Sequence, residues 1–251
     1  MANETVIFLP GFMCDARLFG PQIRHLSAQG HDCRVADLSN AATIERMASQ
    51  ILRQADKKFA LVGLSMGGIV ALEIMRQAAG RVTHLALLNT TARHDAAGAV
   101  RKAQMKRVVG GALDIVLREE LKPQYLAPQN RTRETLDLLD NMGASLGEDA
   151  FVKQSMALTI RRDAFDILAG IACPTLLLAG EQDRVCPPDR HEEIACRIPH
   201  AELRIFPGCG HISTLERPNE VNAALLDLLG RRRSVRKDRR ACHLRVIDRH
   251  N

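Results

Sequence analysis

The sequence predicts an α/β fold in which helices cover both faces of a mostly parallel sheet. Short apolar runs of strand length alternate with longer segments whose apolar residues recur at helical spacing. This alternation implies parallel strands joined by crossover helices. A glycine-rich turn, Gly63-x-Ser65-x-Gly67, stands between one apolar run and the helical pattern after it. A length of 251 residues with 46% apolar residues suits one globular domain that buries a substantial core.

Each expected element follows from a local pattern. Apolar runs that end in turn residues predict six strands, at residues 5–9, 33–36, 59–62, 85–88, 175–179 and 203–206. Apolar residues three and four positions apart predict four helices, at residues 22–28, 44–55, 68–79 and 219–229. The last helix has Pro218 before it and Gly230 after it, which are typical start and stop signals.

One segment breaks the alternation of strands and helices. Residues 92–167 show helical patterns and no convincing strand, with Gly110-Gly111 and Pro123 separating the pieces. We therefore expect residues 1–91 and 168–230 to form the core, with residues 92–167 inserted between two core strands as a helical cap.

The positive charge is concentrated at the end of the chain. The formal net charge is +6, yet residues 231–251 alone hold nine Lys or Arg and two Asp, so the rest is close to neutral. A basic tail can bind nucleic acid or an anionic membrane surface. This tail has no aromatic residue to stack on bases, so a solvated, disordered end is favoured over a nucleic-acid partner.

The turn around Ser65 has the spacing of a nucleophile elbow. Only glycine tolerates the flanking positions of so sharp a strand-to-helix turn, because a Cβ would collide with neighbouring backbone. The first N–H groups of the following helix have no partner within it and carry partial positive charge. An anion that forms beside Ser65 would therefore be stabilised, with the N–H of Met66 as one donor.

An acid and a histidine follow in order after later strands. Asp183 lies in Gly180-x-x-Asp183-x-x-x-Pro187, and His211 lies in Gly208-x-Gly210-His211, with Glu216 and Pro218 after it. With the Ser65 turn, these motifs resemble the α/β-hydrolase family from about residue 6 to residue 230. The resemblance implies an α/β-hydrolase fold with Ser65, His211 and Asp183 as catalytic triad, and the N–H of Phe12 as second oxyanion-hole donor.

Other assignments of these roles are weaker. Asp95, after the fourth strand, is an alternative acid. His84 and His94 follow no comparable turn and His191 lies in an expected helix, so all three are expected at the surface. Candidates for lining an acyl pocket are Met13, Met105, Met142, Met156, Val185 and Ile212, although the cap methionines equally suit ordinary helix packing.

The expected function is hydrolysis of a small carboxylic ester through an acyl-Ser65 intermediate. The layout resembles small carboxylesterases that include pimeloyl-carrier-protein methyl ester esterase, and cofactor-free perhydrolases. A thioesterase, lactonase, amidase, carbon–carbon bond hydrolase or perhydrolase on the same triad stays open, as does a non-catalytic binding protein. Pro10-Gly11 replaces the His-Gly of many family members, and the loop at residues 37–40 is shortened. Because of these two departures, the resemblance does not identify the substrate.

Cofactors and compartment follow from absences in the sequence. The Ser65 turn does not match the G-x-G-x-x-G dinucleotide fingerprint, and seven scattered cysteines fit neither a disulfide framework nor a zinc site. We expect no cofactor and no metal ion, and a small-molecule acyl substrate as the partner. Without a secretory signal or an apolar run of membrane-spanning length, the protein is expected to be cytoplasmic. The oligomeric state is not predicted.

Overall fold

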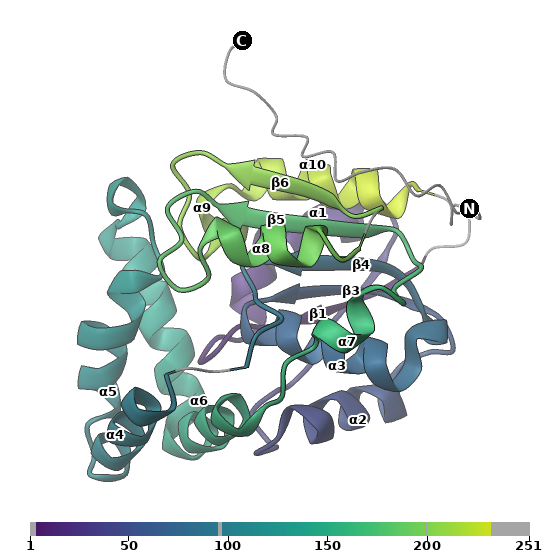
Figure 1. Cartoon of the computed structure of the whole chain (residues 1–251). Coiled ribbons are helices and arrows are strands. Elements are labelled where there is room, and N and C mark those ends of the chain that lie inside the picture. Colours follow the sequence, from purple (N-terminus) through teal and green to yellow (C-terminus); the bar gives the residue numbers. More distant parts are fainter. Residues whose placement is uncertain (1–3, 95–96, 199, 232–251) are drawn as a thin grey trace.

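The structure, a computed structural model, describes residues 4–94, 97–198 and 200–231. Six parallel strands form one sheet in the order β2-β1-β3-β4-β5-β6 (Figure 1). Their bounds are β1 Thr5–Leu9, β2 Asp32–Val35, β3 Phe59–Leu64, β4 Val82–Leu88, β5 Thr175–Gly180 and β6 Glu202–Phe206. The predicted parallel sheet is confirmed, and the strands beginning at residues 59 and 85 are longer than the sequence indicated.

Burial along the strands explains their composition. All six residues of β3 and all six of β5 are buried, because helices cover both faces of a parallel sheet. Neighbouring residues of β3 point to opposite faces: Leu61 joins one hydrophobic cluster and Val62 the other. At the edge, β2 alternates between exposed and half-buried residues, and its charged Asp32 and Arg34 suit a strand with no outer neighbour.

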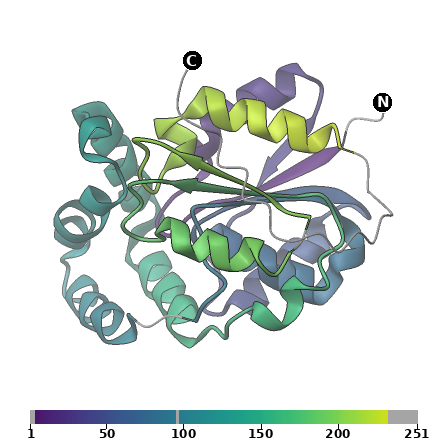
Figure 2. The ribbon, with the colours of Figure 1, turned by 45° about the horizontal axis from the view of Figure 1, so that its top comes forward.

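Helices form a layer on each side of the sheet (Figure 2). One layer contains α1 (Gly20–Ala28) and α10 (Pro218–Leu229), which contact each other. The other contains α2 (Ile44–Gln54), α3 (Met66–Ala78) and α8 (Pro188–Ala195). The four helices predicted from periodicity are all present, with ends shifted by up to two residues.

The segment between β4 and β5 is helical, and we keep the name cap for residues 92–167. It comprises α4 (Gly98–Val109), α5 (Leu113–Ile115), a π-helical turn (Val116–Leu121), two 3-10 turns (Lys122–Gln124 and Pro128–Asn130), α6 (Arg133–Ile160) and α7 (Phe165–Leu168). Helix α6 is interrupted at Gly147, where φ is 79°. Helices α4 to α6 lie together beside one end of the sheet (Figure 1).

The end of the described chain is attached to the core. Arg231, which the sequence analysis groups with the basic tail, forms ion pairs with Asp227 and Glu202. Residues 232–251, the rest of that tail, lie outside the described residues. No helix in the described part of the chain is both long and apolar enough to cross a membrane.

Strand order determines where a ligand can bind. Strand β1 lies between β2 and β3, so the chain moves to one side of β1 and then returns to the other. Such a switch point opens a crevice beyond the carboxyl ends of β1 and β3. Gly11 and Phe12 follow β1, and Ser65 follows β3, so both turns open into this crevice.

Candidate active site

Ser65 occupies a strained turn between β3 and α3. Its φ is 56° and its ψ is −117°, a conformation that residues with a Cβ rarely adopt. A Cβ on Gly67 would lie 1.9 Å from the carbonyl oxygen of Leu9, and one on Gly63 would lie 2.5 Å from that of Gly67. The Ser65 N–H donates to the Leu88 carbonyl over 2.9 Å, which fixes the turn against β4. The two flanking glycines are therefore required by close backbone approach.

Ser65, His211 and Asp183 form one hydrogen-bonded chain. The Nε2 atom of His211 lies 2.8 Å from Ser65 Oγ, and its Nδ1 atom lies 2.8 Å from Asp183 Oδ2. His211 and Asp183 are only 1% and 4% exposed. An ionised Asp183 accepts from Nδ1–H, so the neutral ring presents Nε2 as acceptor for the Ser65 hydroxyl. The three side chains that the sequence places far apart thus meet with hydrogen-bonding geometry.

Asp183 is surrounded by donors. Burial raises the pKa of its carboxyl, but the His211 ring and several hydrogen bonds lower it, and the net pKa lies below the ordinary value. Those bonds come from the backbone N–H groups of Val185 (2.8 Å) and Cys186 (2.9 Å) and from Asn89 Nδ2 (3.0 Å). Asn89 has a φ of 46° and directly follows β4. Asp183 therefore stays ionised at neutral pH.

The loop that carries His211 is held by a second carboxylate. Glu216 accepts hydrogen bonds from the backbone N–H groups of Gly210 (3.0 Å), Ile212 (3.2 Å) and Ala127 (2.9 Å). The backbone N–H of His211 donates to the carbonyl of Tyr125 over 2.8 Å. The centroids of the His211 and Tyr125 rings lie 5.4 Å apart. Residues on both sides of the cap boundary therefore orient the imidazole.

Two residues of the cap form hydrogen bonds to the loop after β1. Met13 has a φ of 52°, its N–H donates to Gln154 Oε1 over 2.9 Å, and its carbonyl accepts from Lys122 Nζ over 2.9 Å. Met66 is the first residue of α3, where a backbone N–H has no partner within the helix. Phe12 therefore precedes a residue that the cap holds in place, and Met66 directly follows Ser65 at the start of α3.

A cavity of about 330 Å³ opens beside Ser65. Its lining includes Val185, one of the candidates for the acyl pocket, and Phe12 and Met66, the two candidate oxyanion-hole residues. Among the lining residues that the sequence analysis did not single out, those with long polar or aromatic side chains are Arg101, Gln104, Gln124, Tyr125, Arg161 and Arg184. Arg184 stands next to Asp183 in the sequence, which was a usable signal. The others come from residues 92–167, the cap segment, whose packing partners are not visible in a local pattern.

The other proposed pocket residues do not line this cavity. Met13 and Ile212 are buried in the core, and Met142 packs in the cluster beneath α1 and α10. Met105 is partly buried against the opposite cluster, and Met156 is 43% exposed. Met13 and Ile212 lie outside the helices, whereas the three cap methionines lie on α4 and α6. Ordinary packing, the alternative left open for the cap methionines, accounts for Met105 and Met142.

The remaining histidines and acids have other positions. The expectation that His191 lies at the surface is wrong: it is fully buried, accepts a hydrogen bond from the Thr90 N–H at Nε2, and burial lowers its pKa to about 4. His84 is half-buried and bonded to Glu4. Asp95, the alternative acid, lies outside the described residues. No cluster of three metal-ligating side chains occurs in the described part of the chain.

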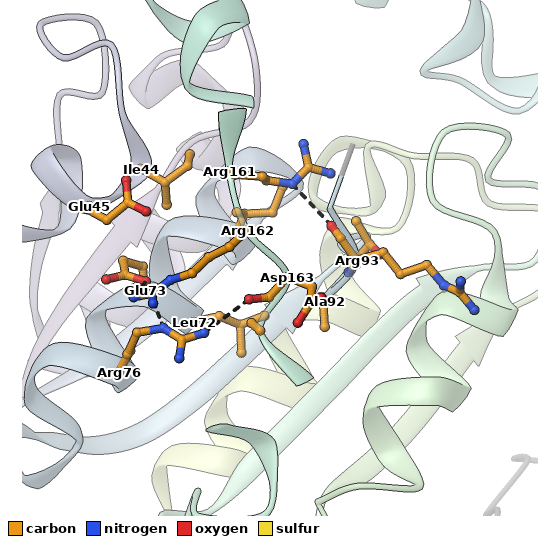
Figure 3. A pocket seen from close by; sticks show the side chains of 13 residues that line it. Ile44, Glu45, Leu72, Glu73, Arg76, Ala92, Arg93, Arg161, Arg162 and Asp163 are labelled. Carbon is orange, nitrogen blue, oxygen red and sulfur yellow. Dashed lines mark hydrogen bonds and ion pairs between the residues drawn. The ribbon is translucent and has the colours of Figure 1, made fainter. Parts of the chain in front are cut away.

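A second, smaller hollow lies between α2, α3 and the segment after α6, and ion pairs fill it (Figure 3). Arg76 and Arg162 both pair with Glu73 there, and Arg76 also donates to the Asp163 carbonyl. Its volume is only about 20 Å³, too little for a substrate. This network fastens the segment after α6 to α3.

Residues 6–224 match the family model described as "Alpha/beta hydrolase family". The chain belongs to the alpha/beta hydrolase family. It is similar to the pimeloyl-[acyl-carrier protein] methyl ester esterase of Aromatoleum aromaticum, at 25% identity over 84% of this chain and 88% of that protein. A Mycobacterium tuberculosis protein that bears the name non-heme bromoperoxidase BpoC is 27% identical over 80% of this chain and 76% of its own length.

A solved structure agrees with this assignment. The thermophilic esterase of Thermogutta terrifontis superposes with a TM-score of 0.81 at 27% identity, over 90% of this chain and 89% of that one. The α/β-hydrolase fold predicted from three short motifs is thereby confirmed, and the chain is an enzyme of the hydrolase class.

Proposed function

We propose that this protein is a serine hydrolase that cleaves a carboxylic ester through an acyl-Ser65 intermediate. The observation that carries the proposal is the continuous hydrogen-bonded chain from Ser65 Oγ through His211 to Asp183. A similar esterase fold and a relative named as a methyl ester esterase support an ester as the bond that is cleaved.

In the first half-reaction, Ser65 Oγ attacks the ester carbonyl while His211 Nε2 takes the hydroxyl proton. Asp183 holds the ring in the required tautomer and stabilises the imidazolium that forms. The carbonyl oxygen becomes an oxyanion that the N–H groups of Met66 and Phe12 stabilise. Losing one such donor costs roughly 100- to 1000-fold in rate in other hydrolases.

The tetrahedral intermediate then collapses. His211 returns its proton to the leaving alkoxide, and the alcohol departs from the acyl-Ser65 ester. In the second half-reaction a water molecule gives its proton to His211 and attacks the acyl carbon. Collapse of this intermediate expels Ser65 Oγ, which recovers the proton, and the carboxylic acid is released.

The test is hydrolysis of p-nitrophenyl esters of increasing acyl length by the wild type and by Ser65→Ala, combined with fluorophosphonate labelling and mass spectrometry. We expect labelling at Ser65 and loss of turnover in Ser65→Ala. Ser49→Ala on α2 is the matched control, because Ser49 bonds only to the Glu45 carbonyl and Gln77 among the described residues.

The outcome separates this proposal from its alternatives. Folded protein that neither turns over esters nor reacts with fluorophosphonate would favour a binding protein with the same fold. Labelling at Ser65 with faster turnover of thioesters, lactones, amides or carbon–carbon substrates, or with perhydrolysis by added peroxide, would keep the nucleophile and replace the ester.

A further inference from the structure

Asn89, the residue directly after β4, combines two unfavourable features in a fully buried position. Its φ is 46°, in the left-handed region that residues with a Cβ rarely adopt. No described residue donates a hydrogen bond to its Oδ1 atom. A buried oxygen without a donor costs stability. Costs of this kind are concentrated at functional sites, so the position calls for a functional explanation.

The amide nitrogen of Asn89, in contrast, makes one bond for each of its two hydrogens. Nδ2 donates to Asp183 Oδ2 over 3.0 Å and to the carbonyl of Gly210 over 3.1 Å. If the amide oxygen and nitrogen were exchanged, Oδ1 would face two acceptors. Only the observed orientation therefore suits both neighbours, and the unpartnered Oδ1 is a consequence of the two bonds that Nδ2 makes.

Asp183 Oδ2 is also the atom that accepts from the His211 ring, at 2.8 Å from Nδ1. The other oxygen of the carboxylate, Oδ1, accepts from the backbone N–H groups of Val185 and Cys186. Each carboxylate oxygen thus has two donors among the described residues. Because both oxygens are bonded, the carboxylate is held in the rotation that directs Oδ2 at the His211 ring, and Asn89 supplies one of the four bonds.

The backbone around Asn89 is fixed against the Ser65 turn. The carbonyl of Leu88 accepts from the Ser65 N–H over 2.9 Å. On the other side, the Thr90 hydroxyl donates to the Ser65 carbonyl over 2.7 Å. Three consecutive residues after and at the end of β4 therefore bond to the loops that carry all three members of the triad.

We propose that Asn89 is a positioning residue of the triad, whose amide holds the Asp183 carboxylate and the His211 loop in register. The inference rests on the proposed function, since it concerns the same reaction. Asn89 is not among the residues that line the cavity beside Ser65, so it acts through Asp183 and His211. Proton transfer from Ser65 depends on this alignment, because small misplacements of catalytic groups cost rate.

Asn89→Gly removes the amide without disturbing the backbone, because glycine adopts a positive φ at no steric cost. We expect kcat for p-nitrophenyl esters, counted per fluorophosphonate-labelled Ser65, to fall by about 10- to 100-fold, as for loss of a hydrogen bond to a charged group. KM should change less. Counting labelled sites keeps unfolded protein out of the comparison. A kcat per labelled site equal to that of the wild type would overturn the inference.

A second measurement follows the hydrogen bond between His211 and Asp183 itself. The Nδ1–H proton of this bond should give a low-field resonance in the proton NMR spectrum, and we expect it to shift in Asn89→Gly because Oδ2 loses a competing donor. Asn40→Gly is the control, since the exposed Asn40 also donates to a carboxylate, Asp37 Oδ2, over 2.5 Å. An unchanged resonance in Asn89→Gly, or an equal shift in both variants, would overturn the inference.

Asn89→Asp separates hydrogen bonding from packing. Aspartate has nearly the same shape and also tolerates a positive φ, but its carboxylate would face the two acceptors that the amide now serves. At mildly alkaline pH, where both carboxylates are ionised, we expect kcat per labelled site to fall at least as far as in Asn89→Gly. Turnover equal to that of the wild type would show that the side chain only fills space, which contradicts the proposal.

These measurements distinguish failure of this inference from failure of the proposed function. Wild-type protein that is labelled at Ser65 and hydrolyses esters, together with an equally active Asn89→Gly, would overturn only the role of Asn89. Absence of labelling in folded wild type, or ester turnover that survives Ser65→Ala, would overturn the proposed function instead. The NMR comparison needs no turnover, so it tests the contact of Asn89 in either case.

Discussion

The ammonium group of Lys122 donates a hydrogen bond to the carbonyl oxygen of Met13 over 2.9 Å, and both side chains are fully buried. Burial lowers the pKa of Lys122, and the nearby Cys14, Asp140 and Asp15 oppose that shift. Its Nζ also lies 5.0 Å from the centroid of the Tyr125 ring. A cap residue therefore fixes the loop that carries the Phe12 N–H.

Lys122→Met tests whether this contact positions the oxyanion loop. The variant leaves the Met13 carbonyl without a donor, so we expect the loop to shift and kcat to fall by about 10-fold or more, with a smaller change in KM. Fluorophosphonate labelling of Ser65 should slow in parallel. Lys153→Met, which removes a surface lysine paired with Asp149, is the control. A kcat equal to that of the wild type in folded Lys122→Met would show that the contact has no positioning role.

Asp183→Asn tests the acid. An amide cannot stabilise the His211 imidazolium and can hold the ring in the wrong tautomer, so kcat should fall by roughly 10,000-fold, as it does for this substitution in a Ser-His-Asp protease. Asp189→Asn on α8 is the control, since Asp189 lies at the surface. Ester hydrolysis at neutral pH by the two variants gives the measurement. Near-normal turnover in Asp183→Asn would contradict the choice of Asp183 and favour Asp95 as the acid.

Glu216→Ala tests the carboxylate that holds the His211 loop. The variant leaves the N–H groups of Gly210 and Ala127 without their acceptor, so the free energy of unfolding should fall by about 2–4 kcal/mol. Turnover should fall as well, because the loop that orients the His211 imidazole loses these hydrogen bonds. Glu220→Ala, an exposed position on α10, is the control in urea titrations. Unchanged midpoints for both variants would refute this role.

Because the pKa of His84 is shifted in the folded protein, we expect the free energy of unfolding to depend on pH. Burial lowers its pKa, but hydrogen bonds to Glu4 and to the Arg231 carbonyl raise it, and the net pKa lies above the ordinary 6.5. The folded state then binds the proton more tightly than the unfolded state, so the stabilisation is complete below about pH 6.5 and is lost as pH rises through the folded-state pKa.

The measurement is the free energy of unfolding of the wild type and His84→Gln between pH 5.5 and pH 9. The wild type should lose its advantage over the variant as the pH increases through this window. His25→Gln, at a half-buried position of α1, is the control. A difference between wild type and His84→Gln that is constant with pH would contradict the assignment.

The sequence by itself determined the frame of the site. Strand-length apolar runs and helical periodicity predict a parallel sheet, and the turns at Ser65, Asp183 and His211 each follow a strand. Carboxyl ends of parallel strands meet at one edge of the sheet, so side chains far apart in sequence converge there. Local backbone requirements, such as the close approach at Gly67, leave a visible mark in the sequence.

Only the tertiary structure decided what surrounds these groups. Periodicity shows that a cap helix has an apolar face, but not which partner covers that face or where its polar residues point. The contact of Lys122 with Met13 spans 109 residues, and Arg161 reaches the cavity only because α6 ends there. For the same reason, Met13, Met105 and Met142 pack in the core and Met156 is exposed, instead of lining the cavity. Specificity depends on such long-range packing, which no local pattern contains.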